Sequence, residues 1–376
     1  VLALNGSGGI QSSSGLINNA SFDITGVTSN VSVRTVTASA GSSILLGAKN
    51  LTITNSSGVI DGVISGVGGS LTLSTGTLTL TGTNTFTGST TVNGGTLTVS
   101  ADANLGAAPG SAASNHLVLN GGTLRSAANF SLSSNREIGL GASGGIISVD
   151  AGLELVVGGV VRGAMLTKAG SGQLTLGGEN TFSGGSTLSA GVLAVSSSTN
   201  LGANGITFDG GTLSILNGSS FVFAHDIALS ASGTVSNANT NGVTFSGNVS
   251  AASTGSKSLT ITGAGNTQFQ SGSISDGSGT LSLLKSGAGT LTLSGTNTFS
   301  GGTTLSAGIL TLDSRATLPS GGDVSISNGT LNLGASNSTV GYFSVNNGTV
   351  TGSGILAGDA FADVSSGTSV ISVNVG

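Results

Sequence analysis

Short bursts of alternating apolar and polar residues run along the whole chain. Leu78 and Leu80 alternate with threonine, and Leu97 and Val99 do the same. A period of two places the apolar side chains on one face of a β-strand and the hydroxyl side chains on the other. Gly, Asn and Asp separate the bursts and allow the positive φ angles that sharp corners require. Since no segment keeps a 3.6-residue period, the sequence predicts an all-β protein with almost no helix.

One strand-and-turn unit recurs three times. Its copies are GTLTLTGTNTFTGSTTVNGGTLTVS at 76–100, GQLTLGGENTFSGGSTLSAGVLAVS at 172–196 and GTLTLSGTNTFSGGTTLSAGILTLD at 289–313. Phe86, Phe182 and Phe299 are equivalent residues of the three copies. We interpret their separations as about four and about five whole turns of roughly 23 to 24 residues, a period typical of solenoids.

This pattern predicts a parallel β-helix, a β-solenoid in which one strand follows another around a coil. One turn cannot bury its apolar face alone, but stacked turns enclose a continuous interior. Such an interior is narrow and suits Val, Ile and Leu, which agrees with an aromatic content of 3%. No break in composition divides the chain. We therefore expect residues 1–376 to form one continuous elongated rod of about 16 turns.

The three copies resemble the autotransporter-associated β-strand repeat of passenger domains in Gram-negative bacteria. The resemblance rests on residues 78–91, 174–187 and 291–304 and on the flanking strands GGTLTV, AGVLAV and AGILTL. It implies a right-handed parallel β-helix carried outside the outer membrane, where passengers of this kind serve as adhesins, aggregation factors or stalks. Neither a signal peptide nor a translocator barrel is recognisable in the sequence, so attachment to the cell surface is an inference.

Composition excludes several classes of protein. Hydrophobic residues make up 37% of the chain and the net charge is only −5, which argues against disorder. Basic residues are scattered from Arg34 to Arg315, whereas binding of nucleic acid requires clustered ones. No apolar run reaches the roughly 18 residues that a membrane-spanning helix needs. With no cysteine, the chain has no disulfide and no cysteine zinc site.

The sequence predicts no catalytic, cofactor-binding or metal-binding residue. His116 has no obvious partner, and His225 is followed by Asp226, although adjacent residues of a strand face opposite sides. The GASGG segment at 141–145 matches the GxSxG pattern, but that nucleophile turn requires a helix after it. Asp209 and Asp226 are separated by less than one expected turn, so they do not stack. A polysaccharide-cleaving β-helix, with acids on neighbouring turns, is the alternative function.

The repeated polar residues are interpreted as structural. Asn84, Asn180 and Asn297 occupy equivalent corners, where we expect their amides to bond the local backbone. The three equivalent phenylalanines are expected to fill a wider corner of the interior. Thr-Leu-Thr triplets, such as 77–79 and 96–98, do not match the expected turn length. A threonine face that binds ice or glycan is therefore a second alternative.

Both ends of the sequence are strand-like and have no polar cap. Unpaired strand edges favour pairing with another chain, so we expect end-to-end or lateral self-association. The resulting hypothesis is a non-enzymatic, extracellular structural or adhesive protein that forms a surface stalk, aggregate or fibre. Its partners would be itself and surface glycans or proteins of a host or bacterium. The end residues proposed for self-association are Val1, Leu2, Leu4, Val370, Ile371, Val373 and Val375.

Overall fold

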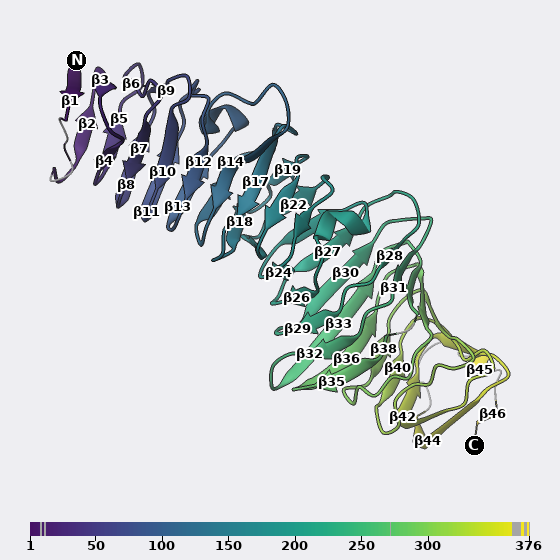
Figure 1. The fold of residues 1–376 in the computed structure, drawn as a ribbon. Coiled ribbons are helices and arrows are strands. Elements are labelled where there is room, and N and C mark those ends of the chain that lie inside the picture. Colours follow the sequence, from purple (N-terminus) through teal and green to yellow (C-terminus); the bar gives the residue numbers. More distant parts are fainter. Residues whose placement is uncertain (8–9, 11–12, 271, 363–369, 372–373, 376) are drawn as a thin grey trace. The chain divides into compact units, whose positions relative to one another are not determined.

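The computed structural model describes residues 1–376 apart from 8–9, 11–12, 271, 363–369, 372–373 and 376 (Figure 1). Its parallel strands form a β-solenoid of about 17 turns, which confirms the predicted fold class. In the described part of the chain, the helical elements are two short 3-10 helices, η1 (Asp102–Leu105) and η2 (Ser198–Leu201). The chain divides into two compact units, unit 1 (1–186 and 199–203) and unit 2 (187–198 and 204–376), and each is described by itself.

Unit 1 has three walls, and the chain visits them repeatedly in the order B, A, C. Each strand pairs in parallel with the strands of its wall one turn before and after it. Wall A contains two sheets, β1 (Leu2–Gly6), β3 (Ser21–Val27), β6 (Ser43–Leu45) and β9 (Val63–Ser65), then β16 (Phe130–Leu132), β19 (Glu154–Val157) and β22 (Gln173–Leu176). Wall B contains β2 (Leu16–Asn18), β5 (Val36–Ala38), β8 (Ser56–Ile60), β11 (Gly76–Leu80), β13 (Thr96–Val99), β15 (Thr123–Ser126), β18 (Gly145–Val149) and β21 (Leu166–Ala169). Wall C contains β4 (Val31–Val33), β7 (Asn50–Ile53), β10 (Ser70–Leu73), β12 (Thr90–Val92), β14 (Ala113–Leu119), β17 (Arg136–Leu140), β20 (Val161–Gly163) and β23 (Thr181–Phe182).

Unit 2 repeats this plan with walls F, D and E, and β24 (Ser186–Leu188) spans the division between the units. Wall F contains β26 (Ile206–Phe208), β29 (Ile227–Leu229), β32 (Val249–Ala251) and β35 (Ile274–Gly277). Wall D contains β25 (Val192–Val195), β27 (Thr212–Ile215), β30 (Gly233–Asn237), β33 (Ser256–Thr262), β36 (Thr280–Lys285), β38 (Thr303–Leu305), β40 (Val324–Ile326), β42 (Ser338–Val345), β44 (Ile355–Ala362) and β46 (Asn374–Val375). Wall E contains β28 (Phe221–Phe223), β31 (Val243–Phe245), β34 (Thr267–Phe269), β37 (Thr290–Leu293), β39 (Ile309–Leu312), β41 (Gly329–Asn332), β43 (Gly348–Thr351) and β45 (Val370–Ile371).

Aliphatic columns fill the interior of each unit. In wall C, Leu51 pairs in register with Leu71, and both are fully buried. The next residues on the two strands, Thr52 and Thr72, are only half-buried. The period-two alternation of the sequence therefore sorts side chains into interior and surface as predicted. Burial of each aliphatic side chain stabilises the fold by roughly 1.5–3 kcal/mol, and the stacked turns bury many such side chains.

The turns of the coil differ in length. Leu71 pairs with Thr90 and Thr90 pairs with Leu117, so the second of these turns is clearly longer than the first. The longer turn contains η1 and the loop after it, which lie outside the paired strands. Insertions are therefore taken up at corners while the register of the walls is kept.

The three repeat copies are not separated by whole turns. Copy 1 begins on β11 of wall B, and copy 2 begins on β22, the strand that follows β21 of wall B after four turns. In unit 2, five turns of wall D connect β25 of copy 2 to β38, and copy 3 ends on the next strand, β39. The prediction of whole turns was wrong because each copy starts one wall later than the previous one. Two series of residues paired from strand to strand trace these turns. The series in wall B is Leu78, Leu97, Leu124, Ile147 and Lys168. The series in wall D is Leu193, Leu213, Val235, Ile261, Lys285 and Leu305.

Candidate functional site

Each repeat copy coincides with the end of a sheet. In copy 1, wall A stops at β9 and resumes at β16, and residues 84–86 and η1 occupy the turns between. In copy 2, residues 181–182 are β23, the last strand of wall C. In copy 3, wall F ends at β35, and one isolated bridge, Thr296 to Thr317, follows. The repeat thus lies where regular strand pairing on one wall ends.

Asn84 of copy 1 connects three successive turns. Its side-chain Oδ1 accepts a hydrogen bond from the Ile64 backbone N–H at 2.8 Å, and its Nδ2 donates to the Asn104 backbone carbonyl at 2.5 Å. These are the donor and acceptor contacts that a backbone unit of a β-strand makes to its two neighbours. The buried amide therefore continues the hydrogen-bond ladder where no strand is present.

Asn180 of copy 2 makes the same contacts, and Asn297 of copy 3 makes weaker ones. The Oδ1 of Asn180 accepts from the Val161 N–H at 2.7 Å and its Nδ2 donates to the Asn200 carbonyl at 2.6 Å. Asn297 donates to the carbonyls of Gly295 and Thr317 at 3.1 and 3.3 Å. The expectation of local backbone bonding was therefore wrong for the first two copies, which bond neighbouring turns instead.

A second motif, missed by the sequence interpretation, lies at a constant distance after each of these asparagines in copies 1 and 2. It is Asn104-Leu105-Gly106 in copy 1 and Asn200-Leu201-Gly202 in copy 2. The Oδ1 of Asn104 accepts from the N–H groups of Ser100 and Ala101, and its Nδ2 donates to the carbonyls of Thr81 and Gly82 one turn earlier. Copy 3 has Thr317-Leu318-Pro319 in this place. The constant offset from the first asparagine was the signal that could have revealed the motif.

Glycine is required in this second motif because a phenylalanine lies against it. Gly106 has φ +91°, and a Cβ there would come within 2.6 Å of the Phe86 carbonyl oxygen and 2.9 Å of its ring. Gly202 stands in the same relation to Phe182. Both rings, and Phe299 of copy 3, are fully buried, which confirms that the repeated phenylalanines fill the interior.

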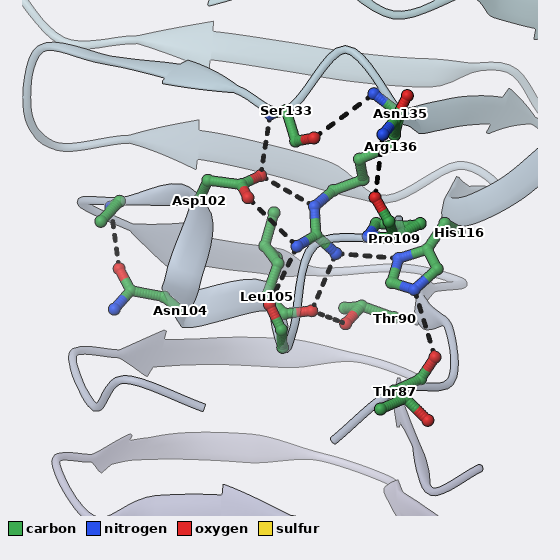
Figure 2. Close-up of polar contacts among 12 residues, drawn as sticks. Thr87, Thr90, Asp102, Asn104, Leu105, Pro109, His116, Ser133, Asn135 and Arg136 are labelled. Atoms are coloured by element: carbon green, nitrogen blue, oxygen red, sulfur yellow. Dashed lines mark hydrogen bonds and ion pairs between the residues drawn. The ribbon is translucent and has the colours of Figure 1, made fainter. Parts of the chain in front are cut away.

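A cluster of charged groups lies at the corner next to copy 1 (Figure 2). Arg136, the first residue of β17, is fully buried, and its Nε and Nη2 bond the two carboxylate oxygens of Asp102 at 2.8 and 3.2 Å. Its Nη groups also donate to the carbonyls of Leu105 and Gly106 and to Nδ1 of His116, at 3.1, 2.9 and 2.8 Å. The five N–H donors of the guanidinium thus have five acceptors, and the side chain ties η1 to wall C.

His116 is a neutral member of this cluster. Burial lowers the pKa of its imidazole, and the positive charge of Arg136 lowers it further. Because Nδ1 accepts from Arg136, the proton lies on Nε2, which donates to the Thr87 carbonyl at 3.3 Å. The sequence interpretation found no partner for His116, because residues 102, 116 and 136 are brought together only by the coil.

Two lysines are buried at equivalent positions just before copies 2 and 3. Lys168 of β21 donates to the carbonyls of Ala169 and Gly170, each at 2.7 Å. Lys285 of β36 donates to the carbonyl of Gly287 and, at 3.3 Å, to that of Ala307 one turn later. Burial lowers the pKa of both ammonium groups to about 8. Copy 1 has Leu73 at this position of its preceding strand.

The other residues singled out in the sequence do not form a catalytic arrangement in the described structure. Residues 141–145 form a turn that leads into β18, so no helix follows Ser143. The carboxylate of Asp226 accepts from the backbone N–H of Asn248 at 2.7 Å, while the His225 ring packs edge-on against Phe223. Among the described residues, no group of three or more His, Asp or Glu side chains could hold a metal ion. Nor is any helix in that part of the chain long and apolar enough to cross a membrane.

The threonine triplets at 77–79 and 96–98 lie on adjacent strands, contrary to the sequence interpretation. Thr77 pairs with Thr96 and Thr79 with Thr98 in wall B. The spacing of the triplets was not recognised as one turn because this turn is shorter than the expected length. Short threonine columns therefore do exist on the surface of the coil.

A family model matches all three repeat copies. The passenger-associated-transport-repeat family matches at residues 73–99, 166–195 and 283–312, which include Leu73, Lys168 and Lys285. The chain is 33% identical over 157 residues to the adhesin BmaC autotransporter of Brucella suis biovar 1. These matches support an autotransporter passenger domain with repeats.

The chain matches only a small part of that relative. The aligned region covers 41% of this chain but only 4% of the BmaC adhesin. No solved structure gives a significant match. The comparisons thus agree with the repeat, and they leave the activity of the complete protein to be proposed.

The bridging asparagines can be tested by comparing two copies. Asn84→Ala should lower the free energy of unfolding by about 2 kcal/mol, because it leaves a buried N–H and a buried carbonyl without partners. Asn297→Ala should cost less, because the bonds of Asn297 are longer. Urea unfolding followed by circular dichroism measures both. Equal costs for the two variants would contradict the bridging role.

The Arg136 cluster predicts a large difference between a buried and an exposed arginine. Arg136→Lys should cost about 3 kcal/mol of unfolding free energy, because three ammonium donors cannot serve five acceptors and buried groups lose their partners. The control is Arg125→Lys at the exposed ion pair with Asp150, 2.8 Å apart, where a change of at most about 1 kcal/mol is expected. Urea unfolding midpoints measure the loss in each variant. Similar losses for the two variants would contradict the role proposed for Arg136.

The buried lysines predict a rise in stability at alkaline pH. Their pKa is about 8 in the folded passenger segment and 10.5 ordinarily, so the unfolded chain binds more protons between these values. Below pH 8 both states are protonated and the cost of burying the charge is constant. Stability should therefore increase from about pH 8 to about pH 10. Unfolding midpoints across this pH range should rise less for the Lys168→Met/Lys285→Met variant than for the unchanged chain. An equal rise in both would contradict the contribution of the two lysines.

Proposed function

We propose that this passenger segment is a non-enzymatic, adhesive part of a surface protein of a Gram-negative bacterium. The observation that carries the proposal is the 157-residue similarity to an autotransporter adhesin, in a chain built as a β-solenoid. Three basic side chains are buried and stabilise the fold. The guanidinium of Arg136 is saturated with hydrogen bonds, and the two buried lysines bond backbone carbonyls.

The surface of such a coil suits adhesion through many weak contacts. Charged residues make up 6% of the chain, so the outward positions of the walls are mostly Thr, Ser, Asn and Gly. These groups form hydrogen bonds without the desolvation cost of a full charge. Regular columns of them offer equal contacts on successive turns. We propose surface glycans or proteins of a host or of other bacteria as the targets.

We further propose that copies of the segment associate into a stalk, aggregate or fibre. The residues proposed from the sequence are Val1, Leu2 and Leu4 at one end and Val370, Ile371, Val373 and Val375 at the other. Strands β45 and β46 are described at the second end, whereas Val373 lies outside the described residues. Addition of strand to strand is the physical route, because an unpaired strand carries free backbone donors and acceptors.

Adhesion and association need separate measurements. Beads coated with the segment should bind epithelial cells or bacteria more than beads coated with heat-unfolded segment, and equal binding would reject adhesion. Sedimentation velocity should show concentration-dependent association that Leu2→Lys/Leu4→Lys reduces severalfold, because buried charge at a strand junction is unfavourable. Val67→Lys, at a side chain that is already 83% exposed, is the control. A segment that stays monomeric at every concentration would reject association.

A further inference from the structure

A groove of about 330 Å³ lies on the outer face of wall E in unit 2. It crosses four successive strands, β28, β31, β34 and β37. Its floor includes the outward column formed by Val222, Thr244, Gln268 and Thr292, whose members are paired in register from strand to strand. Asn241, Asn266 and Ser220, from the turns that precede the strands, form its rim. A volume of this size is within the range of small-molecule sites.

The groove is lined by neutral hydrogen-bonding groups. None of the described residues that line it is Asp, Glu, Lys, Arg or His. Within the described residues, the hydroxyls of Thr244 and Thr292 make no hydrogen bond to protein, and Gln268 makes one long bond, to Ser294 Oγ at 3.3 Å. Asn266 is held in place because its Oδ1 accepts from the Thr290 N–H at 3.0 Å. The groove therefore presents hydroxyl and amide groups that are free to bind a ligand.

Apolar surface accompanies these polar groups. Val222 is 51% exposed, and Phe221 lines the groove and is half-buried. A ligand that matches the groove must therefore combine hydroxyl groups with a C–H face and carry no net charge. A pyranose ring has this combination, and an anionic or cationic ligand does not.

The floor is held rigidly from behind. Phe223, Phe245 and Phe269 lie on the interior side of β28, β31 and β34, three of the four strands that the groove crosses. Their rings stack in sequence, with centroids 5.1 and 5.2 Å apart and planes inclined by 22° and 21°. All three are buried. Rigid placement of binding groups lowers the entropic cost of holding a ligand.

The column continues beyond the groove along wall E. Thr292 is paired with Thr311, Thr311 with Asn332 and Asn332 with Thr351. Neighbouring strands are about 4.8 Å apart, a spacing comparable to the length of one pyranose unit in a chain. Gln268 and Asn332 interrupt the threonines, so the face is not the uniform array that matching an ice lattice requires.

We propose that wall E binds a neutral linear glycan, one sugar unit to a strand, with Thr244, Gln268 and Thr292 as the central contacts. This inference rests on the adhesive function proposed above and names its ligand class. Thr and Gln side chains donate to and accept from ring hydroxyls, while Val222 and Phe221 pack against a sugar face. The neighbouring polar column extends the site along the chain of the ligand.

Calorimetric titration of the complete segment with cellohexaose, hexa-N-acetylchitohexaose and laminarihexaose tests the proposal. At least one neutral hexasaccharide should bind, and a hyaluronan hexasaccharide should not. Thr244→Val/Thr292→Val keeps the β-branched shape and should weaken binding by about tenfold, the loss expected of two ordinary hydrogen bonds. The matched control is Thr234→Val/Thr260→Val, on paired strands of wall D, which should bind like the unchanged segment.

The outcomes separate this inference from the proposed function. If no neutral hexasaccharide binds, or if the wall E and wall D variants bind equally, the glycan site is wrong. If the segment then still coats beads that adhere to cells, adhesion stands and acts through another surface. Unchanged circular dichroism and unfolding midpoints show that a binding loss in the wall E variant is not a loss of fold.

Discussion

Hydrogen bonding between successive turns is the constraint on which the rest of this structure depends. A strand of the coil has no hairpin partner, so its N–H and C=O groups are satisfied only by the turns before and after it. Where a strand is missing, those groups must find other partners. Asn84 and Asn180 supply them, each accepting from the previous turn and donating to the next. The repeat thus allows a wall to end without leaving buried backbone groups unpaired.

Two of the buried cations serve the same constraint. Arg136 bonds the carbonyls of Leu105 and Gly106, and Lys285 bonds those of Gly287 and Ala307. All four carbonyls lie at corners, where strand pairing ends and no N–H is opposite. A long cationic side chain can bring several donors to such a place, but the depressed pKa of the lysine shows that its burial is unfavourable. Arg136 avoids this because Asp102 neutralises it within the same corner.

The fold could be predicted because period-two alternation and a recurring unit both act locally. Burial of the repeated phenylalanines followed from the same logic. The Arg136 cluster could not be predicted, because its members lie far apart in sequence and the unequal lengths of the turns decide which positions meet. The pairing of Thr77 with Thr96 was missed for that reason. The Asn104 motif was different, since its offset from Asn84 recurs unchanged in copy 2 and was available in the sequence.

The one-wall step between copies has a consequence for the surface. Each of the three copies lies where a different wall is interrupted or ends: wall A at copy 1, wall C at copy 2 and wall F at copy 3. In unit 2, copy 3 follows the last strand of wall F, while wall E continues from β28 to β45. An unbroken wall keeps its side chains in register over many turns, and register is what produces columns of equal contacts. The repeats therefore separate two tasks, because the interrupted wall takes up the irregular corners and the continuous wall presents a regular surface.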